Sequence, residues 1–125
     1  MLRDILIFAG IDSRYVIFPG GKVLVHRSEL ESLRREISAI TFEILRLCKK
    51  RLDIAKRIAM VKLRANLPIE DSRIEENLRR RVIIFCREKG LHEDFCNALL
   101  DLLIKESKRV QKEVIEHVYA WGETN

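Results

Sequence analysis

A helical pattern over residues 28–64, unbroken by glycine or proline, constrains the fold of this 125-residue chain most strongly. Apolar residues recur there at steps of three and four, as on the buried face of one helix: Leu33, Ile37, Ile40, Ile44, Leu47, Ile54, Ile58 and Val61. A capping box of Ser28 and Glu31 predicts the start, and Pro68 follows the end. About 36 residues would span roughly 54 Å. A compact globule of this size is narrower, so we expect a second chain to cover the excess length.

Two further helices follow the first. The second is predicted to open at Asp71 or Ser72, with Ser72 and Glu75 as another capping box, and to stop before Gly90, which suits the position after a helix end. The third is predicted from about residue 93 to about residue 120, with Gly122 marking its end. The expected order is therefore a very long, a short and a medium helix.

Residues 1–27 differ in character from the rest. Three β-prone runs, 5–8, 15–18 and 23–25, predict two or three short strands, the last two suited to a hairpin. We therefore divide the chain into an N-terminal extension (1–27), a helical domain (28–121) and a tail (122–125). The extension could pair with its twin in a dimer, cap the helices, bind a feedback amino acid or dock a pathway partner.

Composition narrows the class of protein. Charged residues make up 34% and apolar residues 47%, which is typical of a soluble globular domain. No apolar run approaches the roughly 20 residues that span a bilayer, and no signal peptide is evident. Cys48, Cys86 and Cys96 are odd in number and lack metal-site spacing, so reduced thiols in a cytoplasmic protein are expected. The net charge of +5 is spread among acids without a basic block, which favours a solvated surface over nucleic-acid binding.

Two cations interrupt the apolar face of the first helix. Arg51 and Lys62 are eleven residues apart and fall within about 20° of one another around the axis. Burying unpaired charge is costly, so converging cations indicate an anionic ligand. Arg34 precedes Arg51 by about 25 Å along the helix and is rotated by about 100°. Arg34 therefore cannot serve the same pocket within one chain. If it contributes to a site, that site belongs to a partner chain, which predicts two symmetric pockets in a twofold dimer.

Polar residues on the other two helices suit the same pocket. Ser107 and Gln111 are separated by four residues and interrupt the third apolar stripe, while Asp71 and Glu75 share the start of the second helix. Each has a plainer interpretation too: an interhelical salt bridge for Arg51, a stem that reaches solvent for Lys62, a cap for Glu75 and surface positions for Ser107 and Gln111.

The whole set resembles the all-helical (AroQ-type) chorismate mutases over about residues 28–115. The matching elements are Leu33-Arg34-Arg35-Glu36-Ile37, Ile44-Leu45, Lys50-Arg51-Leu52, Ala55, Lys62, Leu67-Pro68-Ile69, Asp71, Glu75, Gly90-Leu91 and Ile104-x-Glu106-Ser107-x-x-x-Gln111. The resemblance implies an all-α, three-helix protomer in an intertwined homodimer with shared active sites. It also implies conversion of chorismate to prephenate in phenylalanine and tyrosine biosynthesis, without cofactor or metal.

The resemblance implies a role for each residue. Lys62 and Gln111 would donate hydrogen bonds to the ether oxygen of the substrate. Arg51 and the partner's Arg34 would hold the two carboxylates of this dianion, with Ser107 assisting. The ring hydroxyl would bind Glu75 and the backbone near Asp71.

Two departures from the family pattern stand out. The family usually has arginine directly before the second-helix glutamate, whereas Arg73 lies one residue early and is a candidate replacement. Thr41 stands where many members carry aspartate, which we interpret as structural. Three rival functions stay open: an isochorismate pyruvate lyase, a non-catalytic helical regulatory or interaction module, and a basic nucleic-acid binder.

Overall fold

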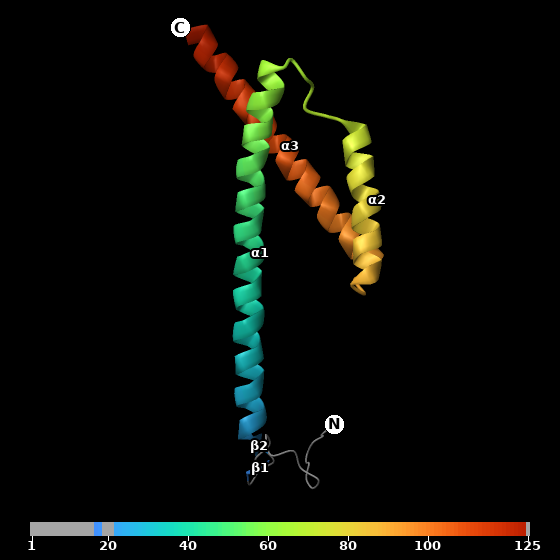
Figure 1. Cartoon of the computed structure of the whole chain (residues 1–125). Coiled ribbons are helices and arrows are strands. Elements are labelled where there is room, and N and C mark those ends of the chain that lie inside the picture. The colour runs from blue at the N-terminus through green and yellow to red at the C-terminus, as the bar shows by residue number, and fades with distance from the viewer. Residues whose placement is uncertain (1–16, 19–21, 125) are drawn as a thin grey trace. The chain divides into compact units, whose positions relative to one another are not determined.

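The computed structural model describes residues 17–18 and 22–124, and its elements are β1 (Ile17–Phe18), β2 (Lys22–Val23), α1 (Leu24–Arg64), α2 (Ser72–Glu88) and α3 (Glu93–Thr124) (Figure 1). The three helices, of 41, 17 and 32 residues, confirm the all-α class and the expected order of lengths. The chain forms two compact units, Met1–Leu45 and Arg46–Asn125, and the boundary between them lies within α1.

The start of α1 differs from the prediction. β1 and β2 form an antiparallel pair with Ile17 opposite Val23, and α1 begins directly afterwards at Leu24. Only the first residue of the predicted strand 23–25 is therefore in a strand, and Ser28 lies inside the helix instead of capping it. Because neither glycine nor proline occurs between residues 22 and 28, nothing in the backbone stops the helix from extending by one turn. The predicted strand over 5–8 lies outside the described residues.

The end of α1 is fixed by a left-handed residue. Asn66 has a φ of 57°, and the backbone N–H of Leu67 donates to the carbonyl of Lys62 at 2.8 Å. This six-to-one hydrogen bond is the Schellman motif, for which asparagine is the usual alternative to glycine. Pro68 then prevents any return to the helix. The connection to α2 therefore leaves the end of α1 in a defined direction.

The N-cap of α2 is one of the two residues at which the sequence predicted this helix to open. The Oδ1 atom of Asp71 accepts hydrogen bonds from the backbone N–H groups of Arg73 and Ile74, so Asp71 is the N-cap. Ser72 is the first helical residue, so the predicted capping box of Ser72 with Glu75 was wrong. The predicted stop is confirmed, because α2 ends at Glu88 and Gly90 follows with a φ of 71°.

Helix α3 is longer than predicted. It continues to Thr124, so most of the expected tail is helical and Gly122 lies inside the last turns. A glycine costs a helix only about 1 kcal/mol relative to alanine. It ends a helix only where it adopts a left-handed conformation, as Gly90 does.

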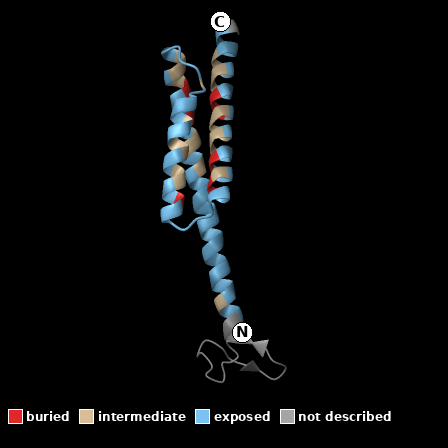
Figure 2. Ribbon diagram, turned by 90° about the vertical axis from the view of Figure 1, so that its right-hand side faces the viewer, coloured by how far each residue is buried: buried red, intermediate tan, exposed pale blue. Residues whose placement is uncertain are grey.

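The core lies in the Arg46–Asn125 unit. Its buried apolar residues come from all three helices: Ala55 and Ala59 from α1, Cys86 from α2, and Cys96, Leu100 and Val110 from α3. Figure 2 shows buried positions along the helix that leads to the C-terminus. Most of these buried residues are small, which allows the helices to approach closely.

No helix within the described residues is long and apolar enough to cross a membrane.

A disulfide joins Cys86 and Cys96, so the prediction of reduced thiols was wrong for this pair. Cys86 lies near the end of α2 and Cys96 near the start of α3, and the short connection brings their Cα atoms to 6.6 Å. That separation lies within the range that a disulfide spans. Both residues are buried, and Cys48 stays a free thiol. A separation of ten residues in sequence gave no sign of this proximity.

Loss of this disulfide should destabilise the protein. Closing a loop of this length removes about 2.7 kcal/mol of entropy from the unfolded chain. We expect the double variant Cys86→Ala/Cys96→Ala to lose about 2–3 kcal/mol of unfolding free energy, measured by denaturant titration at fixed protein concentration. Cys48→Ser is the control and should match the parent chain. Equal stability of the parent and the double variant would contradict the prediction.

Candidate active site

A cavity of about 410 Å³ opens in the Arg46–Asn125 unit. Its walls are mostly apolar, and they come from α1, α2, α3 and the connection between α1 and α2. The polar and charged residues on the lining are Arg51, Lys62, Asp71, Glu75, Ser107, Lys108 and Gln111. A mostly apolar cavity with a few converging polar groups is typical of a small-molecule site.

Arg51 is held in the cavity wall by neutral acceptors. Its Nη1 atom donates to the carbonyl of Leu103 at 2.8 Å and also to Oγ of Ser107. Within the part of the chain that the structure describes, Arg51 forms no ion pair with a carboxylate. The guanidinium is therefore oriented by α3 while its charge stays uncompensated, which suits an anionic ligand.

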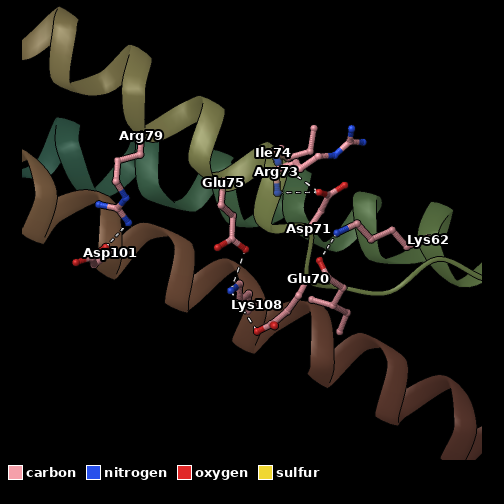
Figure 3. A network of polar contacts seen from close by, with 10 residues as sticks. Lys62, Glu70, Asp71, Arg73, Ile74, Glu75, Arg79, Asp101 and Lys108 are labelled. Atoms are coloured by element: carbon pink, nitrogen blue, oxygen red, sulfur yellow. Dashed lines mark hydrogen bonds and ion pairs between the residues drawn. The ribbon is translucent and has the colours of Figure 1, made fainter.

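Lys62 is also held by a neutral hydrogen-bond acceptor. It is half-buried, and its Nζ atom donates to the carbonyl of Ile69 in the connection between α1 and α2 (Figure 3). Lys62 and Arg51 therefore line one cavity, as the helical geometry predicted. Over the described residues Lys62 also has no carboxylate partner.

Gln111 is the buried polar residue of the site. Only 6% of it is exposed, and its Oε1 atom has no hydrogen-bond partner among the described residues. Buried polar atoms are nearly always hydrogen-bonded. The two ends of an amide are assigned from their partners, so this side chain can offer either a donor or an acceptor to a ligand in the cavity.

Lys108 is a cavity residue that the sequence analysis missed. Its Nζ atom lies 2.9 Å from Oε2 of Glu75 on α2 and 3.3 Å from Oε1 of Glu70 in the preceding connection (Figure 3). The hydrogen bond from Lys108 to Glu75 is the main cause that raises the pKa of Lys108 above its usual value. Lys108 precedes Gln111 by three residues, and this spacing could have placed both on one face of α3.

The structure does not bring Arg73 to the cavity. Arg73 is absent from the cavity lining and lines a separate surface hollow with Asn77 and Arg80, whereas its neighbour Ile74 lines both. Figure 3 shows the side chain of Arg73 directed away from Lys108. Successive helical residues are rotated by about 100°, so a shift of one position in sequence moves the guanidinium to another face of α2.

Arg34 lies in the other unit, Met1–Leu45, and is exposed on α1. Leu33, Ile37, Ile40 and Ile44 share this part of α1, and each is more than half exposed. The hydroxyl of Thr41 donates to the carbonyl of Ile37 at 2.8 Å, so it serves the helix backbone. No cluster of three histidine, cysteine, aspartate or glutamate side chains that could hold a metal ion occurs in the described segments.

Comparison with known proteins agrees with this geometry. The family described as chorismate mutase type II matches residues 33–112, well over half of the chain. A chorismate mutase of Methanocaldococcus jannaschii is 30% identical over 88 residues, which cover 70% of this chain and 89% of that protein. A 4-amino-4-deoxychorismate mutase of Streptomyces venezuelae is 29% identical, with coverage of 74% and 89%. A bifunctional chorismate mutase/prephenate dehydratase of Aquifex aeolicus is 42% identical over 60 residues, 48% of this chain and 17% of that protein. The chain therefore belongs to the chorismate mutase type II family.

Proposed function

We propose that this chain catalyses the rearrangement of chorismate to prephenate. The observation that carries the proposal is the arrangement of two uncompensated cations, Arg51 and Lys62, with the unpartnered Oε1 atom of Gln111 on one largely apolar cavity. These groups match a small dianion that also carries a neutral oxygen acceptor. Membership of the chorismate mutase type II family supports the same substrate.

The proposed reaction takes place within one molecule. The ether C–O bond breaks while a C–C bond forms between the enolpyruvyl carbon and the ring, so no proton or electron enters or leaves. The protein has to hold the compact conformer in which these two carbons are close. It also has to place positive potential at the ether oxygen, which gains negative charge in the transition state.

The residues on the cavity divide into these two tasks. Lys62 and Gln111 donate to the ether oxygen, and Arg51, supported by Ser107, binds one carboxylate. Glu75 can only accept a hydrogen bond when ionised. The ring hydroxyl is the donor that the substrate offers, and it is therefore the partner proposed for Glu75. The backbone beside Asp71 completes the hydroxyl site.

The second carboxylate is assigned to Arg34 of a second copy of the chain. In the Met1–Leu45 unit, the apolar residues flanking Arg34 are exposed along α1, with Ile37 68% exposed. An apolar stripe of this length favours contact with another protein surface. A twofold homodimer would cover the stripe in both chains and supply one arginine to each site.

The proposal places the reaction in aromatic amino-acid biosynthesis in the cytoplasm. Bifunctional relatives couple a chorismate mutase to a prephenate dehydratase, so consumption of prephenate towards phenylalanine or tyrosine is the expected sequel. The disulfide is compatible with this location, because intracellular proteins of hyperthermophiles carry disulfides. The single glutamine amid many glutamates, lysines and arginines agrees with a heat-adapted protein.

The test is the loss of chorismate absorbance with purified protein, no added cofactor and EDTA present. We expect saturable loss with prephenate as the product. The matched control is the same protein unfolded by denaturant, which should leave only the uncatalysed rate. Inactivity of a folded dimer towards chorismate would refute the proposal. Release of pyruvate from isochorismate by the same preparation would replace it with the lyase.

A further inference from the structure

The pairing of Lys108 with Glu75 bears on which group the substrate ring can carry. Glu75 reaches into the cavity from α2, and Lys108 reaches it from α3, with Nζ and Oε2 2.9 Å apart. Their side chains are only 24% and 31% exposed, so solvent screens the pair incompletely. Of the ion pairs seen among the described residues, this is the one that joins two residues of the cavity wall.

The next cation along α2 from Glu75 is already engaged. Arg79, one turn further along α2, donates to Asp101 at 2.5 Å and to Asn97 at 2.9 Å. Ile74, directly before Glu75, is apolar and also lines the cavity. Among the described residues, Lys108 is therefore the cation that forms an ion pair with the Glu75 carboxylate.

The anchoring of Lys108 keeps it at this point. Glu70 holds the same ammonium from the connection between α1 and α2, with Nζ and Oε1 3.3 Å apart. Both carboxylates raise the pKa of Lys108, so the side chain stays charged at neutral pH. A carboxylate that already contacts a lysine ammonium attracts a cationic group of a ligand less than a lone carboxylate would.

This charge arrangement separates two classes of ring substituent. A hydroxyl is neutral and needs only an acceptor oxygen, which Glu75 can supply while it is paired. An aliphatic amino group is protonated at neutral pH, and its ammonium would lie next to the ammonium of Lys108. Two ammonium groups that contact the same carboxylate would repel one another, and a partly desolvated cavity screens this repulsion only weakly.

We propose that Lys108 is a specificity-determining residue, which makes the Glu75 subsite select a ring hydroxyl over a ring ammonium. The inference rests on the proposed function, because that function assigns the ring substituent to Glu75. It adds a residue outside the set that the sequence predicted, and it says which chorismate-like dicarboxylate the cavity rejects.

The test compares two substrates in matched variants. We expect the parent chain to have a much higher kcat/KM for chorismate than for 4-amino-4-deoxychorismate. Lys108→Met keeps the length of the side chain and removes the charge, so it should lower the ratio of the two kcat/KM values at least about tenfold. The change should come from a gain in kcat/KM for the amino compound. Lys108→Arg retains the charge and should keep the parent ratio.

Two further variants separate this role from a structural one. Lys105→Met removes an exposed lysine from the same helix and should leave the ratio unchanged. Glu75→Gln combined with Lys108→Met should abolish the gain for the amino compound, because the attracting carboxylate is gone. The coupling between positions 75 and 108 is a readout that simple destabilisation would not produce.

The possible outcomes test the specificity role of Lys108 separately from the proposed function. An equal loss of kcat/KM for both substrates in Lys108→Met would overturn the specificity role and leave Lys108 as a general contact for the dianion. An unchanged ratio would overturn it as well. Failure of the parent chain to convert chorismate at all would instead refute the proposed function.

Discussion

Replacing Lys62 with alanine should lower kcat at least about a hundredfold while KM changes by only a fewfold. Removing one preorganised donor from a developing negative charge typically costs two to three orders of magnitude, roughly 10²–10³, in kcat. The ether oxygen of chorismate is a weak acceptor in the ground state and a strong one in the transition state. An interaction of this kind therefore appears in kcat much more than in binding.

The measurement is steady-state kinetics of chorismate conversion, with the fold of the variant checked by circular dichroism. Lys56→Ala is the control, because Lys56 is an exposed lysine on α1 outside the cavity lining. Its kcat and KM should equal those of the parent chain. A Lys62→Ala protein with the parent kcat would remove Lys62 from the catalytic step.

Arg34→Ala and Arg51→Ala should each abolish nearly all activity, and an equimolar mixture of the two should recover about a quarter of it. Each variant alone forms dimers in which both sites lack one carboxylate-binding arginine. In a mixed dimer, one site receives intact Arg34 from one chain and intact Arg51 from the other, while the second site lacks both. Random pairing makes about half of the dimers mixed, with one working site in each.

The mixture should be unfolded together and refolded, and activity compared with each variant treated alone. The control is a mixture of Arg51→Ala with Lys62→Ala. Both residues line the cavity of one chain, so no pairing restores a complete site. Recovery in that control, or its absence in the first mixture, would contradict the shared site.

The helical framework could be predicted because its signals are local. The three- and four-residue spacing in α1, the acceptor side chain of Asp71 and the left-handed Gly90 each act within one or two turns. The same regularity also predicted part of the candidate site. Because rotation per residue is constant along a helix, the sequence could place Arg51 and Lys62 on one face, and both line the cavity.

The features that sequence reasoning missed depend on contacts between helices. Cys86 and Cys96 meet only because the turn at Gly90 lays α3 back along α2. Lys108 is one of many lysines in the sequence, and no local sequence pattern predicts that Glu70 and Glu75 contact it. The start of α1 was misplaced at Ser28 for the opposite reason, because a local capping preference was given too much weight against an uninterrupted backbone.

The hydrogen bond from Lys62 to the carbonyl of Ile69 uses only one of the three donors of the ammonium. A lysine facing bulk water would have to shed a hydration shell before it could reach the ether oxygen. Here the ammonium is already tied to the connection between α1 and α2, which limits the directions in which the other two donors can point. The rigidity of that connection therefore sets how precisely the ammonium can be aimed at a ligand.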